Sequence, residues 1–321
     1  MRSSLRWRCQ LALAGLLGVL LIPSVTAAQG DGPRVYLLAP VGINALSLTY
    51  MDMASNMNFA GNILIQDVDF ESDVGALNYN HFFSLGGRFA EIWVTPIWGT
   101  VRGSLEVGDD PPPIIPFPPG TNLDVPSESG FADPYVAMRV GLLGAPPLKP
   151  EEFMQHKQSF QMHALLGANV PIGDYDSGRP INLGTNRWAV RLGLPMVLPI
   201  GSPAKQTFWE IVPSLMLFTD NSDPFEAERR EQDPLGIVES HLSRNFTKKV
   251  WGSVDLRYQH GGETTTDGVS DDNRLGQLGG GVSLGYAINR SWSLFAGYGG
   301  IIAKNDNSKG DMFRFRLIWA F

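Results

Sequence analysis

The chain ends in the stretch Phe313-Arg314-Phe315-Arg316-Leu317-Ile318-Trp319-Ala320-Phe321, in which bulky apolar residues alternate with arginines and smaller residues. Every second side chain of a β-strand points to the same face, so the aromatic groups would share one face and the arginines the other. A transmembrane barrel strand needs this pattern, because lipid covers one face, the polar lumen lies on the other, and roughly ten residues cross the bilayer. The alternative, an edge strand of a soluble sandwich, would leave an aromatic terminus exposed to water. The stretch therefore favours a transmembrane barrel.

The other end of the chain has the features of an export signal. Arg2, Arg6 and Arg8 form a positive start, an apolar run covers residues 11–22, and small residues up to Ala28 offer a cleavage site. A membrane anchor is the alternative, but the run is shorter than the roughly 20 residues that a spanning helix needs. We therefore predict a signal peptide that ends at residue 28 (1–28).

Composition narrows the class of the exported chain. Its one cysteine, Cys9, would leave with the signal peptide, so no disulfide or thiol chemistry is expected. Without the three signal arginines the chain holds 22 Lys and Arg against 32 Asp and Glu, a net charge of −10. This balance argues against a nucleic-acid partner, since no basic cluster is present to follow a phosphate backbone. The sequence has no second long apolar run, which excludes a helical membrane protein.

Alternating segments between turn residues recur along the rest of the chain and predict an all-β fold, a transmembrane antiparallel β-barrel of about twelve strands. Residues 186–199 show the pattern, with Trp188 facing lipid and Arg187 facing the lumen. The alternation breaks in the third segment, where a bulge near Gly99 would restore it. The predicted strands are 44–53, 74–83, 89–107, 131–144, 158–170, 186–199, 207–219, 235–246, 250–260, 275–287, 291–303 and 312–321.

The connections between these strands fall into two classes. With the N-terminus in the periplasm, four of the five inner turns are short and all the outer loops but the last are long, as in bacterial barrels. The outer loops sum to a charge of −16 and the inner turns to +5. The long inner turn, 145–157, contains Pro150 and would hold one helical turn. The outer loops are 54–73, 108–130, 171–185, 220–234, 261–274 and 304–311.

A short segment, residues 29–43, precedes the first strand, and the barrel itself is expected over residues 44–321. Residues 35–38, Val-Tyr-Leu-Leu, are consecutive and apolar, which suits burial on both sides. The prolines on either side would keep this segment out of the sheet. We therefore expect the segment to fold against the barrel interior or its periplasmic mouth and to restrict the pore.

Charged side chains on the inward face would line the lumen. A three-residue turn at 247–249 would set Glu239 opposite Arg257 and His241 opposite Asp255. Such pairs would line a permeation path and select charge, or they would form an ion-pair network that fills a narrow barrel. An excess of about three inward positive charges predicts a weak anion preference. The candidate lumen residues are Arg139, Arg187, Arg191, Glu210, Glu239, His241, Asp255, Arg257, Arg314 and Arg316.

Signatures of an enzyme, a metal site or a cofactor are weak. No serine is clearly placed to be activated by His241 and Asp255, and the histidines show no zinc spacing. No phosphate-cradling glycine motif occurs. We expect no catalytic residues, no metal and no cofactor. A structural barrel without transport and a barrel enzyme of the lipase or protease type stay open as alternatives.

Four blocks of sequence carry a resemblance to a known family. They are Arg34-Val35-Tyr36-Leu37-Leu38-Ala39-Pro40-Val41-Gly42; Val170-Pro171-Ile172-Gly173-Asp174-Tyr175 with Ile181-Asn182-Leu183-Gly184-Thr185-Asn186; Thr219-Asp220-Asn221 with Asp223-Pro224-Phe225; and Leu256-Arg257-Tyr258 before Gly261-Gly262-Glu263-Thr264. The blocks resemble the transporter-like barrel family named for a "putative MetA pathway of phenol degradation", and the resemblance covers nearly all of the mature chain. It implies an outer-membrane barrel with a role in the uptake of aromatic or other hydrophobic compounds. It provides no catalytic residues.

Taken with the barrel pattern, the resemblance predicts a channel or transporter of the bacterial outer membrane for the passive uptake of small molecules. The expected partners are outer-membrane lipid and a small-molecule solute. Phe321 resembles the closing residue of bacterial outer-membrane barrels, so the barrel assembly machinery is a third expected partner.

Overall fold

The structure, a computed structural model, describes residues 30–58, 63, 68–106, 121–202, 205–304 and 306–321. The predicted signal peptide lies outside the described residues. No helix in the described part of the chain is long and apolar enough to cross a membrane.

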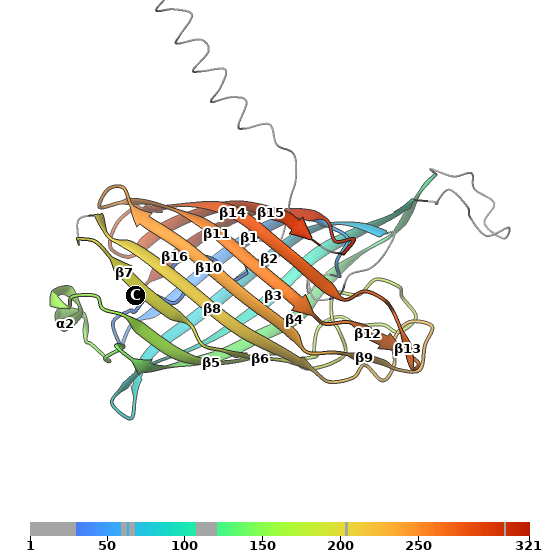
Figure 1. The fold of residues 1–321 in the computed structure, drawn as a ribbon, viewed down its shortest axis with the longest axis horizontal. Coiled ribbons are helices and arrows are strands. Elements are labelled where there is room, and N and C mark those ends of the chain that lie inside the picture. Colours follow the sequence, from blue (N-terminus) through green and yellow to red (C-terminus); the bar gives the residue numbers. More distant parts are fainter. Residues whose placement is uncertain (1–29, 59–62, 64–67, 107–120, 203–204, 305) are drawn as a thin grey trace, which may run out of the picture.

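Twelve antiparallel strands form a closed barrel (Figure 1), as the alternating pattern predicts. The barrel closes where β16 pairs with β1, in a register that sets Trp319 opposite Leu46. One of the twelve consists of two short pieces, β6 and β7, which pair with the same neighbours, β5 and β8. The strands are β1 (Asn44–Ser55), β2 (Val68–Leu85), β3 (Arg88–Glu106), β4 (Asn122–Leu143), β5 (Gln161–Asn169), β6 (Ala189–Gly193), β7 (Met196–Ile200), β8 (Thr207–Phe218), β10 (Leu235–Asn245), β11 (Val250–Gly261), β14 (Leu275–Ala287), β15 (Trp292–Lys304) and β16 (Gly310–Ala320).

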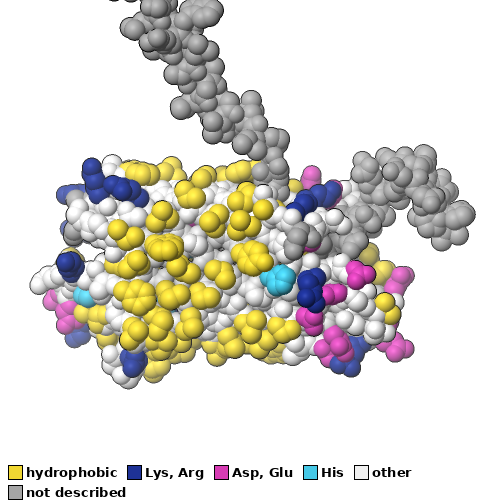
Figure 2. All heavy atoms as spheres, viewed as in Figure 1, with side chains coloured by type: hydrophobic (Ala, Val, Ile, Leu, Met, Phe, Trp, Pro, Cys, Tyr) yellow, Lys and Arg dark blue, Asp and Glu magenta, His cyan; other side chains and the backbone are white. Residues whose placement is uncertain are grey.

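The outer wall of the barrel is apolar and the inner wall is polar. In β16, Phe313, Phe315 and Trp319 are exposed on the outside, whereas Arg314 between them is only 4% exposed. Figure 2 shows the apolar side chains as a broad band around the visible face of the barrel, with acidic side chains gathered at one end. This band is the surface that lipid would cover, which confirms the transmembrane assignment of the C-terminal strand.

The connections differ between the two ends of the barrel. The longest inner turn carries α2 (Pro150–Gln155), so the predicted helical turn is present, and Glu152 caps it through the Lys149 amide at 2.8 Å. At the opposite end the outer loops form a small sheet of β9 (Arg230–Gln232), β12 (Thr264–Thr266) and β13 (Val269–Ser270).

The structure corrects three details of the predicted strands, and proline accounts for one of them. The predicted strand 186–199 is interrupted at Pro195, because proline has no N–H for the ladder. The bulge expected near Gly99 is not in this strand: β3 pairs with β2 in one register, and the two register shifts against β4, between Thr95 and Ile97 and between Val101 and Gly103, place the extra residue in β4. β2 and β4 reach farther outward than predicted, because their polar outer ends continue the pairing with β3 beyond the apolar alternation.

Candidate functional site

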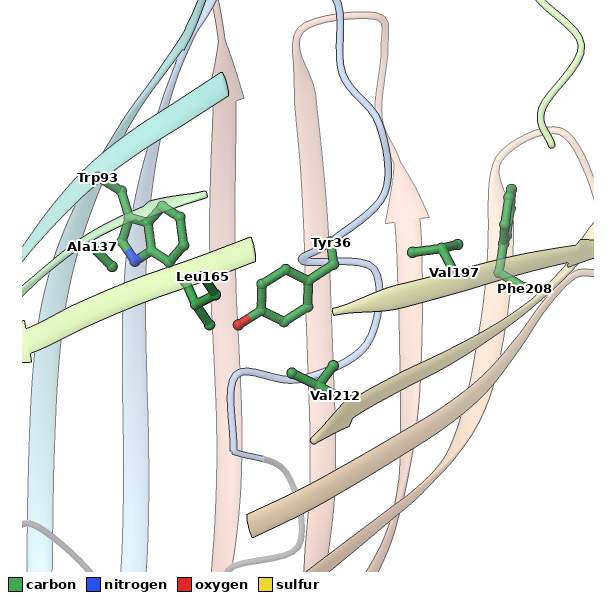
Figure 3. Packing of buried hydrophobic residues seen from close by; sticks show 7 residues of the cluster. All are labelled: Tyr36, Trp93, Ala137, Leu165, Val197, Phe208 and Val212. Atoms are coloured by element: carbon green, nitrogen blue, oxygen red, sulfur yellow. The ribbon is translucent and has the colours of Figure 1, made fainter. Parts of the chain in front are cut away.

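Residues 30–43, hereafter the N-terminal segment, lie inside the barrel. Tyr36 is 1% exposed and packs among apolar side chains of five neighbouring strands (Figure 3). Its hydroxyl donates to Asp31 Oδ2 at 2.5 Å. The segment therefore fills the lumen on the side of these strands. The side chains around Tyr36 are Trp93, Ala137, Leu165, Val197, Phe208 and Val212.

Arg139 of β4 holds the middle of the N-terminal segment. Its Nη1 and Nη2 atoms donate to the backbone oxygens of Tyr36 at 2.6 Å and Leu37 at 3.0 Å. Its Nε donates to Glu91 Oε2 at 2.5 Å, and both side chains of this ion pair are almost fully buried. Since a buried charge needs a partner, Arg139 ties β3, β4 and the segment into one unit.

Arg34 holds the segment to the opposite strands. Its amide donates to Glu210 Oε1 at 2.7 Å, and its guanidinium donates to Ser243 Oγ at 3.0 Å and Asn245 Oδ1 at 2.8 Å. The guanidinium also lies 4.3 Å from the centre of the Trp251 ring, which is a favourable cation–π distance. Ser243, Asn245 and Trp251 belong to the periplasmic ends of β10 and β11, so this contact lies near the inner mouth.

Asp31 is the acceptor at the start of the segment. Arg191 Nη1 donates to its carboxylate at 2.7 Å, and its own amide donates to Glu239 Oε2 at 3.1 Å. Arg314 and Arg316 donate to its backbone oxygen at 3.3 and 3.4 Å. Three inward arginines of the barrel therefore converge on one residue of the segment.

The predicted pairing of β10 with β11 is confirmed. The register sets Glu239 opposite Arg257 and His241 opposite Asp255. Arg257 Nε lies 3.7 Å from Glu239 Oε1, and His241 Nδ1 lies 2.9 Å from Asp255 Oδ1. The turn at Thr247–Lys249 thus places the four side chains as the sequence indicates.

His241 and Asp255 belong to a fully buried polar network. Ser253 and Ser283 both donate to Asp255 Oδ2, at 3.1 and 2.6 Å. The second ring nitrogen of His241 lies 3.5 Å from Glu239 Oε2. The two serine hydroxyls are therefore bound to the carboxylate and not to the imidazole, which a serine nucleophile would require.

All ten candidate lumen residues face inward. Arg187 stands apart from the others, since it lies at the outer end, just before β6, among the outer loops. The other nine lie in the strands of the lumen wall. They are Arg139, Arg191, Glu210, Glu239, His241, Asp255, Arg257, Arg314 and Arg316.

Four charged residues of the lumen were missed by the sequence reasoning. Asp31 and Arg34 lie outside any strand, so parity could not place them. Glu91 is 3% exposed and shares the inward face of β3 with Phe89 and Trp93, a signal that the irregular phase of the third segment obscured.

The fourth missed residue, Asp133, changes the charge balance together with the other three. It is 4% exposed and lies where the register of β4 shifts, so strand parity did not reveal it. Among the described residues assigned to the lumen above there are then seven arginines and six carboxylates, so the predicted excess of three positive charges is wrong: it falls to one, leaving His241 aside. The arginines are Arg34, Arg139, Arg187, Arg191, Arg257, Arg314 and Arg316, and the carboxylates are Asp31, Glu91, Asp133, Glu210, Glu239 and Asp255.

Beside the N-terminal segment lies a cavity of about 560 Å³. The segment forms one side, and β1, β2, β3, β15 and β16 supply much of the other. Methionines and aromatic rings share this lining with arginines. Because methionine is flexible and polarizable, such a wall adapts to apolar ligands of different shape. These methionines and aromatic residues are Met51, Met53, Met57, Met216, Met312, Phe82, Trp93, Tyr135, Trp251 and Phe295.

The loop between β5 and β6, residues 170–188 and hereafter the infolded loop, covers the outer end of the lumen. Ile181 and Leu183 are buried against apolar side chains of β2, β3 and β4. Asp133 accepts three hydrogen bonds from the loop, from the Gly173 amide at 3.0 Å, the Thr185 amide at 2.8 Å and the Thr185 hydroxyl at 2.6 Å. The Asp133 carboxylate therefore holds the loop at Gly173 and again at Thr185.

A second pocket, of about 500 Å³, lies among the outer loops and is hereafter the outer pocket. Asn58 lines both this pocket and the lumen cavity, so the two spaces adjoin. Arg187 and Arg230 line the outer pocket. Burial, together with nearby Arg230, lowers the pKa of Arg187 to about 10, so this guanidinium remains charged at neutral pH.

Among the residues that the structure describes, no three His, Cys, Asp or Glu side chains gather closely enough to hold a metal ion. The acidic outer loops are instead partly neutralised by exposed ion pairs. Arg274 lies 2.9 Å from Glu263, and the Ser270 hydroxyl donates to the same carboxylate. These two hydrogen bonds lower the pKa of Glu263, with that from Ser270 the larger cause.

Comparison with known proteins supports the fold. The chain is similar to an outer membrane channel of Pseudomonas putida F1, with 21% sequence identity, a TM-score of 0.71, and coverage of 90% of this chain and 99% of that one. It is also similar to the β domain of a Bordetella autotransporter, with 11% identity, a TM-score of 0.48 and coverage of 87% and 99%. A FadL homologue of Pseudomonas aeruginosa shows 10% identity, a TM-score of 0.43 and coverage of 93% and 98%.

A family model matches most of the sequence. Its description reads "Putative MetA-pathway of phenol degradation", and it aligns with residues 55–317. The match spans β2 to β16 and includes the infolded loop. No curated protein matches the chain.

Proposed function

The chain belongs to the family described as "Putative MetA-pathway of phenol degradation", and on that premise we propose that it is a channel for the passive uptake of small apolar molecules, phenolic compounds among them, across the bacterial outer membrane. The observation that carries the proposal is the cavity of about 560 Å³ inside a closed barrel, lined by methionines and aromatic rings and adjoining the outer pocket. Sites for small molecules typically have about 300–1,000 Å³ and a mainly apolar lining with a few polar groups.

In this proposal the N-terminal segment and the infolded loop are the two closures of the route. A solute would enter through the outer pocket, pass the infolded loop into the cavity, and leave when the segment yields at the inner mouth. The inward arginines that bind the segment would then line the open path and act on passing charge.

An enzymatic role is the less supported alternative. The buried network of His241, Asp255, Ser253 and Ser283 has its hydroxyls on the carboxylate, and His241 and Asp255 are both 0% exposed. A hydrolase needs a nucleophile that a substrate can reach. We therefore propose that this network stabilises the barrel wall.

The test is solute uptake in a Gram-negative host whose own general porins have been deleted. The initial uptake rate of labelled phenol should rise when the protein is expressed. Ala76 faces the cavity, so the Ala76→Trp variant should return the rate to that of the empty host by filling the route. Heat-modifiable gel bands would show that both proteins are folded at equal amounts. A native rate equal to that of the empty host would contradict the proposal.

A further inference from the structure

The outer pocket contains the guanidinium of Arg187, and one nitrogen of this group has no hydrogen-bond acceptor in the described part of the chain. Arg187 is 3% exposed, its Nη2 donates to Gln232 Oε1, and its guanidinium lies 4.8 Å from the centre of the Phe218 ring. Its Nη1 is buried and has no hydrogen-bond partner among the described residues. A buried charged donor without an acceptor costs free energy. A ligand that supplies an acceptor to this atom would remove that cost, which favours binding.

A second arginine of the lining adds positive charge near this atom, whereas the nearby carboxylates of Asp133 and Asp220 lie outside the lining. Arg230 also lines the pocket, with its Nε donating to Thr266 Oγ1 at 3.0 Å. Arg179, a third lining arginine, is already paired with Glu128 at 2.7 Å. The acidic residue of the lining, Asp271, accepts hydrogen bonds from the hydroxyls of Thr264 and Thr266. The N–H groups that a ligand could bind in this pocket therefore belong to Arg187 and Arg230.

Among the polar side chains of the pocket lie several apolar and aromatic ones. Phe225, Ile181, Phe70 and Val101 contribute to the lining, and the last three are buried. Tyr175 adds its ring, since its hydroxyl is engaged with the Asp223 oxygen at 2.8 Å and with Asn221 at 2.8 Å. A ligand that fits such a space has one compact anionic group and one flat apolar body.

We propose that the outer pocket is a binding site for a small aromatic carboxylate, with the carboxylate on Arg187 and Arg230 and the ring against Phe225 and Ile181. A carboxylate is preferred to a phenol, because a phenolic group with a pKa of about 10 is neutral at pH 7, and a guanidinium binds an anionic acceptor more strongly than a neutral one. The site goes beyond the proposed function, since a solute can bind at the outer pocket whether or not it crosses the barrel.

The experiment is titration calorimetry on the folded protein in detergent micelles at pH 7, with benzoate as the probe. Benzyl alcohol tests the need for the charge, and cyclohexanecarboxylate tests the need for the ring. Benzoate should bind most tightly and benzyl alcohol most weakly. No heat from benzoate would overturn the proposal, equal binding of benzyl alcohol would overturn the anion site, and equal binding of cyclohexanecarboxylate would overturn the aromatic preference.

Substitutions locate the site. Arg187→Gln should weaken benzoate binding at least about tenfold, because a hydrogen bond to a charged group of about 1.5–3 kcal/mol is lost. Arg187→Lys keeps the charge and should retain part of the affinity. Arg229→Gln is the matched control, since Arg229 neighbours Arg230 but pairs with Asp220 and Glu231 outside the lining. Equal weakening in the Arg187→Gln and Arg229→Gln variants would reject Arg187 as the anchor.

A deletion separates this proposal from the channel itself. Removal of residues 29–41 takes away the N-terminal segment, which does not line the outer pocket. Benzoate affinity should therefore stay within about twofold of the native value, a difference of less than about 0.5 kcal/mol, while passage through the barrel changes. Loss of benzoate binding in this folded variant would show that the binding site lies in the lumen and would overturn the assignment to the outer pocket.

Discussion

The two closures of the lumen are held in different ways. Side chains of β4, β6, β8, β10 and β16 form ion pairs or hydrogen bonds with the N-terminal segment, and most of these side chains are charged and buried. The infolded loop is anchored to the wall mainly by hydrogen bonds, three of them to the Asp133 carboxylate and two between Asp174 and the Phe131 backbone, and by a small apolar cluster. Breaking a buried ion pair costs more than releasing a few hydrogen bonds near the barrel mouth. We therefore expect the outer closure to open more readily than the inner one.

The largest effect is expected from the pair that holds the inner closure. Glu91→Ala leaves Arg139 buried with only backbone oxygens as partners, and the barrel should lose about 3–5 kcal/mol of unfolding free energy. Urea titration followed by tryptophan fluorescence measures this loss. Asp73→Ala, which removes the exposed partner of Arg102, is the control and should cost about 1 kcal/mol or less. Equal losses in the two variants would mean that the inner closure is not held by desolvated charge.

The outer closure should respond to loss of the Asp133 carboxylate. In Asp133→Ala the amides of Gly173 and Thr185 lose their acceptor, and their protection from hydrogen exchange should fall by about tenfold or more. Asp223→Ala, on an exposed outer loop, should leave both amides protected. Unchanged protection in the Asp133→Ala variant would show that other contacts, among them the apolar cluster and the hydrogen bonds between Asp174 and Phe131, keep the loop in place.

A smaller effect concerns the charge of the open path. With the N-terminal segment deleted, the excess of one positive charge predicts only a slight anion preference in a KCl gradient. Arg314→Gln combined with Arg316→Gln should reverse this preference, because these two arginines bind mainly backbone and hydroxyl oxygens and not carboxylates. Arg290→Gln in an inner turn should change the reversal potential little. A strong cation preference before substitution would contradict the charge count.

The smallest effect is expected at the rim of the outer closure. Arg179 pairs with Glu128 and Asp176, but its side chain is about half exposed. Arg179→Gln should therefore cost about 1 kcal/mol or less and should leave the Gly173 and Thr185 amides protected. A loss of protection as large as that in Asp133→Ala would mean that rim ion pairs hold the loop as firmly as the buried carboxylate.

Strand alternation in the sequence was sufficient to predict the barrel and the inward side of its wall. Arg314 and Arg316 could be assigned to the lumen because a strand has a period of two, and the short turn at 247–249 set the pairing of Glu239 with Arg257. Residues outside regular strands carry no such period. Asp31, the partner of Arg191, comes from an irregular segment, and Asp133, which holds the infolded loop, comes from a register shift, so only the three-dimensional structure reveals them.

The central claim is that the N-terminal segment closes the inner part of the route, and single-channel recording in a planar bilayer tests it most directly. Protein with the segment present should give little steady current, whereas the variant that lacks residues 29–41 should give stable open-channel current. A heat-modifiable gel band must show that the deleted variant is a folded barrel. Equal conductance of the two folded proteins would contradict the claim and would make the segment a lining of the lumen without a closing role.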